Sequence, residues 1–318
     1  MTTPMQLESL KVSDTVSYYY FDSGDIPGNT YTTLVFIPGM GFNGGVFRKL
    51  FPLAAAHRIR IVSLYRRDYN PTTSFRDADL AGLVSRTVEG QEGFLRSQAV
   101  DIATFLVMFA REQHIPLAEV VAHLDALPYN VLSDLEKYLH TVVCHDVSGI
   151  LIGIPRPPGF GLSVEYWTEP DSREEEALMT SRLTNPQTNL TPCTSCTPGE
   201  FAELTSAKTF GSSDTLLITI QPDILKAMTR RAVFDPTLAE KFLPNLRVRY
   251  MCGGTSPGVI VWALHEFKKC LADPKPVYGP NAGKGRDLKF KFQTEGNHFI
   301  FWDEPEVALQ QYIATINL

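Results

Sequence analysis

Several features that would place the chain in other protein classes are missing from its sequence. Its 318 residues carry 29 Lys and Arg against 35 Asp and Glu, so no basic excess supports nucleic-acid binding. The N-terminal residues lack a cationic start followed by an apolar stretch, so we expect no secretory signal. We also expect no membrane span, because no apolar run looks long enough. These absences predict a cytoplasmic protein; a peroxisomal address, suggested only by the final Leu318, is the weaker alternative.

Cysteine is scarce as well. The chain has five cysteines, an odd number, and without an export signal we expect them to be reduced. Cys193 and Cys196 form a single Cys-x-x-Cys pair, whereas a structural zinc site normally shows a second pair. We therefore expect neither a metal site nor a cofactor.

Strand-like and helix-like segments alternate along most of the chain, and 44% of the residues are hydrophobic, enough for a sizeable core. The alternation predicts a mostly parallel, doubly wound α/β sheet whose working residues lie beyond the carboxyl ends of the strands. We expect strands at 16–21, 33–37, 60–64, 141–144, 246–252 and 288–292. We expect helices at 46–57, 93–114, 117–139, 259–271 and 304–316.

The middle of the chain has a different character. Residues 154–244 contain many prolines, an acidic run and a Thr/Asn/Cys/Pro loop, and only short segments with helical periodicity. We interpret this stretch as an inserted helical cap. The cap divides the sheet-forming core into residues 1–153 and 245–318.

The most informative motif follows the last expected strand. His298 lies there on a turn, in the sequence GNHFIFWDEP. This stretch resembles the α/β-hydrolase superfamily, in particular fungal esterase-like and epoxide-hydrolase-like members, in which the catalytic histidine occurs in a similar His-Phe-x-x-Trp-Asp-x-Pro context. The resemblance implies that His298 is the catalytic histidine of an α/β-hydrolase-like fold.

Two further segments extend the resemblance. The loop FIPGMGFNGGVF resembles the oxyanion-hole loop of this superfamily, with Pro38 in place of the usual histidine, which implies that the backbone amides of Met40 and Gly41 bind the oxyanion. The segment SLYRRDYNPTTSF resembles an Arg-Arg-Asp-Tyr loop, in which we expect Asp68 to pair with Arg66 or Arg67.

The nucleophile that the resemblance requires is missing from its place. In this superfamily it follows the central fifth strand, but here the chain runs from one expected helix to the next across Ile115 and Pro116. No glycine occurs between Gly93 and Gly149, and a nucleophile elbow needs small residues. We therefore predict that the fifth strand is absent and that the strand at 141–144 pairs directly with the strand at 33–37. The alternative is a strand formed near residues 113–122.

Ser256 is the apparent substitute, because Gly254 to Gly258 reads G-x-S-x-G. However, Pro257 follows it and has no amide hydrogen to give to an oxyanion hole. No convincing acid lies between Ser256 and His298 either. We interpret Ser256 as part of a turn and helix cap, and we leave the nucleophile unknown. Asp146, directly after the strand at 141–144, is the predicted acid.

The resemblance implies hydrolysis of an ester-like, mostly apolar small molecule, with a role in secondary metabolism as one interpretation. Two alternatives remain within the same fold: an epoxide hydrolase, and a non-catalytic protein that keeps the binding pocket. A third is a chain that omits a segment at the Ile115–Pro116 junction. Without a nucleophile elbow we predict negligible esterase activity. The sequence leaves the oligomeric state and the substrate open.

Overall fold

The computed structural model describes residues 6–28, 30–116, 131–155 and 195–318. The chain divides into two compact units. One unit comprises Met1–His140, Ser195–Gln221 and Glu304–Leu309, and the other comprises Thr141–Thr194, Pro222–Asp303 and Gln310–Leu318. The described part of the expected cap contributes helices to each of them.

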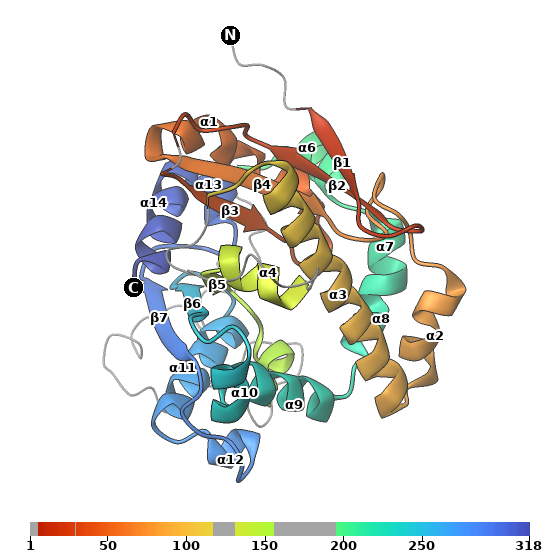
Figure 1. Ribbon diagram of the computed structural model, residues 1–318, viewed down its shortest axis with the longest axis vertical. Coiled ribbons are helices and arrows are strands. Elements are labelled where there is room, and N and C mark those ends of the chain that lie inside the picture. Colours follow the sequence, from red (N-terminus) through yellow and green to blue (C-terminus); the bar gives the residue numbers. More distant parts are fainter. Residues whose placement is uncertain (1–5, 29, 117–130, 156–194) are drawn as a thin grey trace. The chain divides into compact units, whose positions relative to one another are not determined.

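The first unit contains a four-stranded sheet in the order β1-β2-β4-β3 (Figure 1). β4 (IRIVSLY) is buried along nearly its whole length, as expected for an apolar strand inside an α/β sheet. It pairs in parallel with β3 and antiparallel with β2. The strands are β1 (Leu7–Lys11), β2 (Ser17–Asp22), β3 (Thr32–Phe36) and β4 (Ile59–Tyr65).

Helices of the first unit cover this sheet, and α3 is the longest. Phe105 and Phe109 of α3 pack edge-on against Tyr20 of β2, with ring centroids 5.4 and 5.5 Å apart. The helical segments are η1 (Gly44–Leu50), α1 (Phe51–Ala54), η2 (Ala55–His57), α2 (Asp77–Ser85), α3 (Val88–Glu112), α4 (Val131–Tyr138), α6 (Pro198–Leu204), α7 (Ala207–Thr209), η5 (Phe210–Asp214) and α8 (Thr215–Ile218).

By length and composition alone, α3 could also cross a membrane, which the sequence had not led us to expect. It is the one such helix among the described residues. In the described chain α3 packs against α2, α4 and β1, and 28% of its apolar window is buried.

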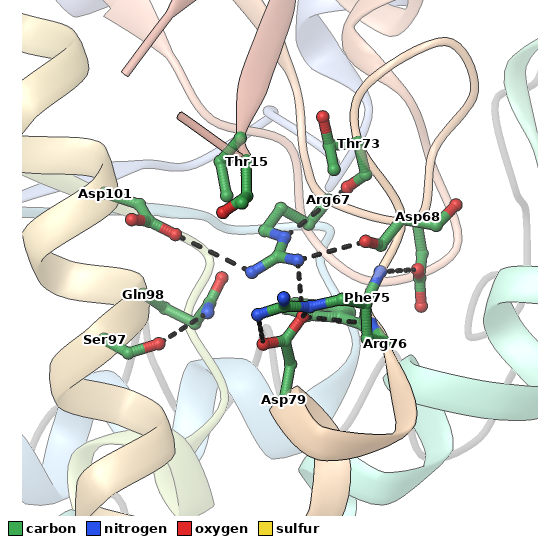
Figure 2. Close-up of polar contacts among 12 residues, drawn as sticks. Thr15, Arg67, Asp68, Thr73, Phe75, Arg76, Asp79, Ser97, Gln98 and Asp101 are labelled. Carbon is green, nitrogen blue, oxygen red and sulfur yellow. Dashed lines mark hydrogen bonds and ion pairs between the residues drawn. The ribbon is translucent and has the colours of Figure 1, made fainter. Parts of the chain in front are cut away.

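The loop after β4 is held by an ion cluster (Figure 2). Arg67 forms a 2.9 Å ion pair with Asp79 of α2, lies 3.8 Å from Asp101 of α3, and stacks over the ring of Phe75. The expected pairing of Asp68 with an arginine is wrong. Asp68 adopts a left-handed conformation, and its carboxylate instead accepts a hydrogen bond from the amide of Phe75 at 2.7 Å.

The second unit contains three parallel strands in the order β5-β6-β7. The hydrophobic core of this unit includes Tyr250 and Cys252 of β6, together with Ala263 and Phe267 of α11. The strands are β5 (Thr141–His145), β6 (Arg247–Gly253) and β7 (Asp287–Gln293). The helices are η3 (Gly149–Ile152), α9 (Pro222–Val233), α10 (Pro236–Lys241), α11 (Gly258–Ala272), α12 (Lys275–Tyr278) and α13 (Ile300–Asp303), and the last helix, α14 (Pro305–Ile316), has residues in both units.

Six of the seven strands in the described chain match expected ones, and β1 was missed. β3 and β5 belong to different units, so the predicted pairing of these two strands stays a prediction. Among the described residues β3 pairs only with β4, and β5 only with β6. The alternative strand near 113–122 and most of the helix expected at 117–139 fall on residues 117–130, outside the described chain.

Candidate functional site

Three turns at the carboxyl ends of β5, β6 and β7 meet in the second unit. The turn after β5 carries Asp146, the turn after β6 carries Ser256, and the turn after β7 carries His298. Neighbouring parallel strands end at the same edge of a sheet, so residues far apart in the chain come together there.

The backbone at Asp146 is in the left-handed region, with φ of 50°. Aspartate tolerates this conformation better than most residues. Two hydrogen bonds fix the turn: the Asp146 amide donates to the carbonyl of Met251 at 2.9 Å, and the Tyr250 hydroxyl donates to the carbonyl of Val147. The Asp146 side chain is thereby directed towards the turn that follows β6.

The structure brings the predicted acid and the predicted histidine together. Oδ2 of Asp146 lies 3.1 Å from Nδ1 of His298. The Asp146 side chain has no exposed surface, whereas 40% of the His298 side chain is exposed. No described residue hydrogen-bonds to Nε2 of His298, so this nitrogen is available to a substrate or a water molecule.

Ser256 also contacts Asp146. Its hydroxyl, almost fully buried, donates to Oδ2, while the Gly253 amide donates to Oδ1 at 2.9 Å. Burial by itself raises the pKa of Asp146, but the imidazoles of His145 and His298 and the Ser256 hydroxyl outweigh it and lower that pKa. The carboxylate is therefore held as an anion. The helix-cap role expected for Ser256 is not seen, since Pro257 is the residue that precedes α11.

A second histidine lies on the other side of the same carboxylate. Nε2 of His145 is 3.8 Å from Oδ2 of Asp146, and its Nδ1 is 2.8 Å from the Tyr312 hydroxyl. Burial lowers the pKa of His145 to about 4 and raises that of Tyr312 well above its ordinary value, so both are neutral near pH 7. The Tyr312 hydroxyl can donate to Nδ1, which leaves the imidazole proton on Nε2, facing Asp146.

The turn that carries His298 is tied to the turn after β6. The Thr255 amide donates to the carbonyl of Gly296 at 2.8 Å, and the Gly254 amide donates to the carbonyl of Gln293 at 2.6 Å. On the other side, the Asn297 side chain accepts from the Phe299 amide, at 2.8 Å. His298 therefore stands on a well-braced loop.

The predicted oxyanion loop belongs to the first unit. The Gly41 amide already donates to the carboxylate of Asp214, at 2.8 Å, and Gly41 has a φ of 86°, which favours glycine. The Met40 amide donates to no described residue. Of the two predicted donors, Met40 is the one open to a ligand.

Asp214 is a site residue to which no sequence motif pointed. Its buried carboxylate accepts hydrogen bonds from Gly41, from the Arg66 guanidinium at 3.0 Å, and from the Tyr69 hydroxyl. Arg66 also donates to the carbonyl of Gly39 at 2.8 Å. Arg66, which was expected to pair with Asp68, instead holds the loop that contains Gly39 and Gly41. No local pattern around Asp214 announces this role.

Metal-binding side chains do not cluster in the part of the chain that the structure describes. Of the Cys-x-x-Cys pair, the structure describes only Cys196, which is a free thiol. Cys193 lies outside the described residues. The chemistry that these residues support is proton transfer: a histidine oriented through Nδ1 by a buried carboxylate can accept a proton at Nε2.

Comparisons with known proteins assign a fold but not an activity. No protein-family model matches the chain, and no curated protein matches it in sequence. Among solved structures, it is similar to an epoxide hydrolase from Solanum tuberosum, crystallised as a point mutant, at 12% identity and a TM-score of 0.50, covering 98% of this chain and 99% of that one. It is similar to an esterase from Exiguobacterium antarcticum at 11% identity and a TM-score of 0.50, with the same coverage. The chain has the α/β-hydrolase fold.

Proposed function

We propose that the protein acts on an ester-like, mostly apolar small molecule. In this proposal His298 is the general base, and the carboxylate of Asp146 orients its imidazole. The observation that carries this proposal is the 3.1 Å contact between Nδ1 of His298 and the buried Asp146 carboxylate. Such a contact fixes the imidazole tautomer and leaves Nε2 to take a proton. The α/β-hydrolase fold, found in an esterase of similar structure, supports the reaction class.

In this proposal Ser256 is not a covalent nucleophile. A serine nucleophile has its proton withdrawn by Nε2 of the histidine, whereas the Ser256 hydroxyl donates to the acid. The general base then activates a water molecule or a hydroxyl group of the ligand. We expect turnover far below that of a working esterase, in line with the missing nucleophile elbow, because general-base catalysis alone contributes about 10²–10⁴-fold.

An epoxide-hydrolase mechanism with Asp146 as nucleophile has less support. An attacking carboxylate needs access to the substrate, and the Asp146 side chain has no exposed surface. Both of its oxygens also accept hydrogen bonds from the protein. The structural similarity to an epoxide hydrolase therefore supports only the fold.

The second candidate is a binding protein that keeps the ligand pocket without turnover. The specific observation in its favour is that Nε2 of His298 has no described partner that could serve as a nucleophile. The two candidates differ in one measurable quantity, the part of ester hydrolysis that depends on His298.

Initial rates of p-nitrophenyl acetate and butyrate hydrolysis test the proposal. We expect slow hydrolysis by the wild type, loss of this rate in His298→Ala, and retention in the control His57→Ala, whose histidine pairs with Glu306 elsewhere in the chain. Equal rates in wild type and His298→Ala would favour the binding protein. Labelling of Ser256 by a fluorophosphonate, detected by mass spectrometry, would replace the proposal with a covalent mechanism.

A further inference from the structure

We propose that Ser256 is a positioning residue, which holds the Asp146 carboxylate so that His298 keeps its proton on Nδ1. This inference rests on the proposed function, because it assigns Ser256 a role in the same acid–histidine pair. It also gives the segment GGTSPG, residues 253–258, a purpose other than that of a nucleophile elbow.

The first step is the carboxylate itself. The terminal torsion of an aspartate side chain is soft, so a carboxylate held at one oxygen can rotate. Here the same turn holds both oxygens of Asp146: the Gly253 amide donates to Oδ1, and the Ser256 hydroxyl donates to Oδ2. Oδ2 is also the oxygen that faces Nδ1 of His298. Ser256 therefore fixes the atom on which the histidine depends.

The second step is the position of the histidine loop. The amides of Gly254 and Thr255 donate to the carbonyls of Gln293 and Gly296, in the turn that leads to His298. Gly253 and Ser256 of this segment thus bind Asp146. Gly254 and Thr255, which lie between them, bind the loop that carries His298. The relative placement of Asp146 and His298 is set through this segment.

The third step is the need for close approach. A Cβ atom at Gly253 would collide with the carbonyl oxygen of Gly296, and one at Gly254 would collide with the carbonyl oxygen of Thr294. The two glycines are required because the turns lie in contact. Packing thus explains Gly254, the first glycine of the G-x-S-x-G pattern. The serine of the pattern lacks the exposed hydroxyl that a nucleophile needs, since Ser256 is buried.

The test reads the tautomer of His298 directly, by long-range 1H–15N correlation from the carbon-bound ring protons at a pH where the imidazole is neutral. We expect Nδ1–H in the wild type and a shift of the population towards Nε2–H in Ser256→Ala. Thr255→Ala keeps the amide that binds the histidine loop and removes an exposed hydroxyl that contacts the Glu295 carbonyl at 3.4 Å but does not contact Asp146. It is the matched control and should keep the wild-type tautomer. Ser256→Cys keeps the side-chain size with a weaker donor and should shift the tautomer if the alanine variant is unstable.

A wild-type tautomer in both Ser256→Ala and Ser256→Cys would overturn the proposal. The His298-dependent hydrolysis rate provides a second readout: Ser256→Ala should lose about 10–100-fold, the loss typical when a hydrogen-bond partner that orients a metal-ligating histidine is changed. If the wild type hydrolyses no ester while Ser256→Ala still shifts the tautomer, the proposed function fails and the positioning role stands.

Discussion

Nδ1 of His298 lies 3.1 Å from Oδ2 of Asp146, although 152 residues separate the two along the chain. The contact exists because β5 and β7 flank β6 in one parallel sheet, so their carboxyl ends lie at the same edge. The Asp146 anion is the centre of the arrangement, since Gly253, Ser256 and His298 all contact it.

The first prediction concerns His145 and pH. Burial lowers the pKa of His145 from 6.5 to about 4, so the unfolded chain binds more protons between these values than the folded chain does. Stability should therefore fall as the pH drops from 6.5 to 4, by at most ~3 kcal/mol from this residue. Asp146, whose pKa is also lowered, contributes a separate loss that begins only below its ordinary value of 3.8.

His145→Gln should remove most of this slope. Urea unfolding at pH 4.5, 5.5 and 6.5 measures it as the change in the free energy of unfolding. Parallel stability curves for the wild type and His145→Gln across this window would show that the buried imidazole is not the cause.

A second prediction tests the close approach of the turns. Gly254→Ala places a Cβ against the Thr294 carbonyl and should cost about 1–3 kcal/mol of stability. The control is Gly199→Ala in α6, where a Cβ meets nothing within 4 Å and alanine favours the helix. Thermal unfolding compares the two variants. An unchanged melting temperature in Gly254→Ala would mean that the turns are not in contact.

A third prediction concerns Asp214 in the first unit. Asp214→Asn weakens the bonds from Arg66 and Gly41 to a buried carboxylate and should destabilise the protein by about 1–3 kcal/mol. Asp14→Asn, at a surface ion pair with Lys11, should leave the melting temperature essentially unchanged. Equal effects of the two changes on Tm would contradict a structural role for Asp214.

Sequence patterns predicted the local elements of this fold well. Strands such as β4 (IRIVSLY) and β6 (RVRYMCG) were found because most of their residues are apolar, aromatic or β-branched. β1 was missed because Leu7–Lys11 is short, mostly exposed and rich in polar residues. The pairing of Asp146 with His298 was expected from the family resemblance, with Asp146 directly after β5 and His298 on the turn after β7.

Contacts between distant residues could not be predicted in this way. Ser256 and Asp146 are 110 residues apart, and Gly41 and Asp214 are 173 apart. The neighbours of Ser256 match a nucleophile pattern, and nothing among them shows that its hydroxyl faces a carboxylate. Likewise, the glycines around Gly41 indicate that another group lies close to this backbone, but they do not identify that group as the Asp214 carboxylate.

The most direct test of the account is the rate of p-nitrophenyl acetate hydrolysis by Asp146→Asn. Asparagine keeps the shape of the side chain but removes the charge that holds the Nδ1 proton of His298, so the imidazole loses its productive tautomer. We predict that the His298-dependent rate falls about 10²-fold or more, to the level of His298→Ala, while the protein remains folded. An unchanged rate in a folded Asp146→Asn protein would contradict the central claim that Asp146 orients His298 as the general base.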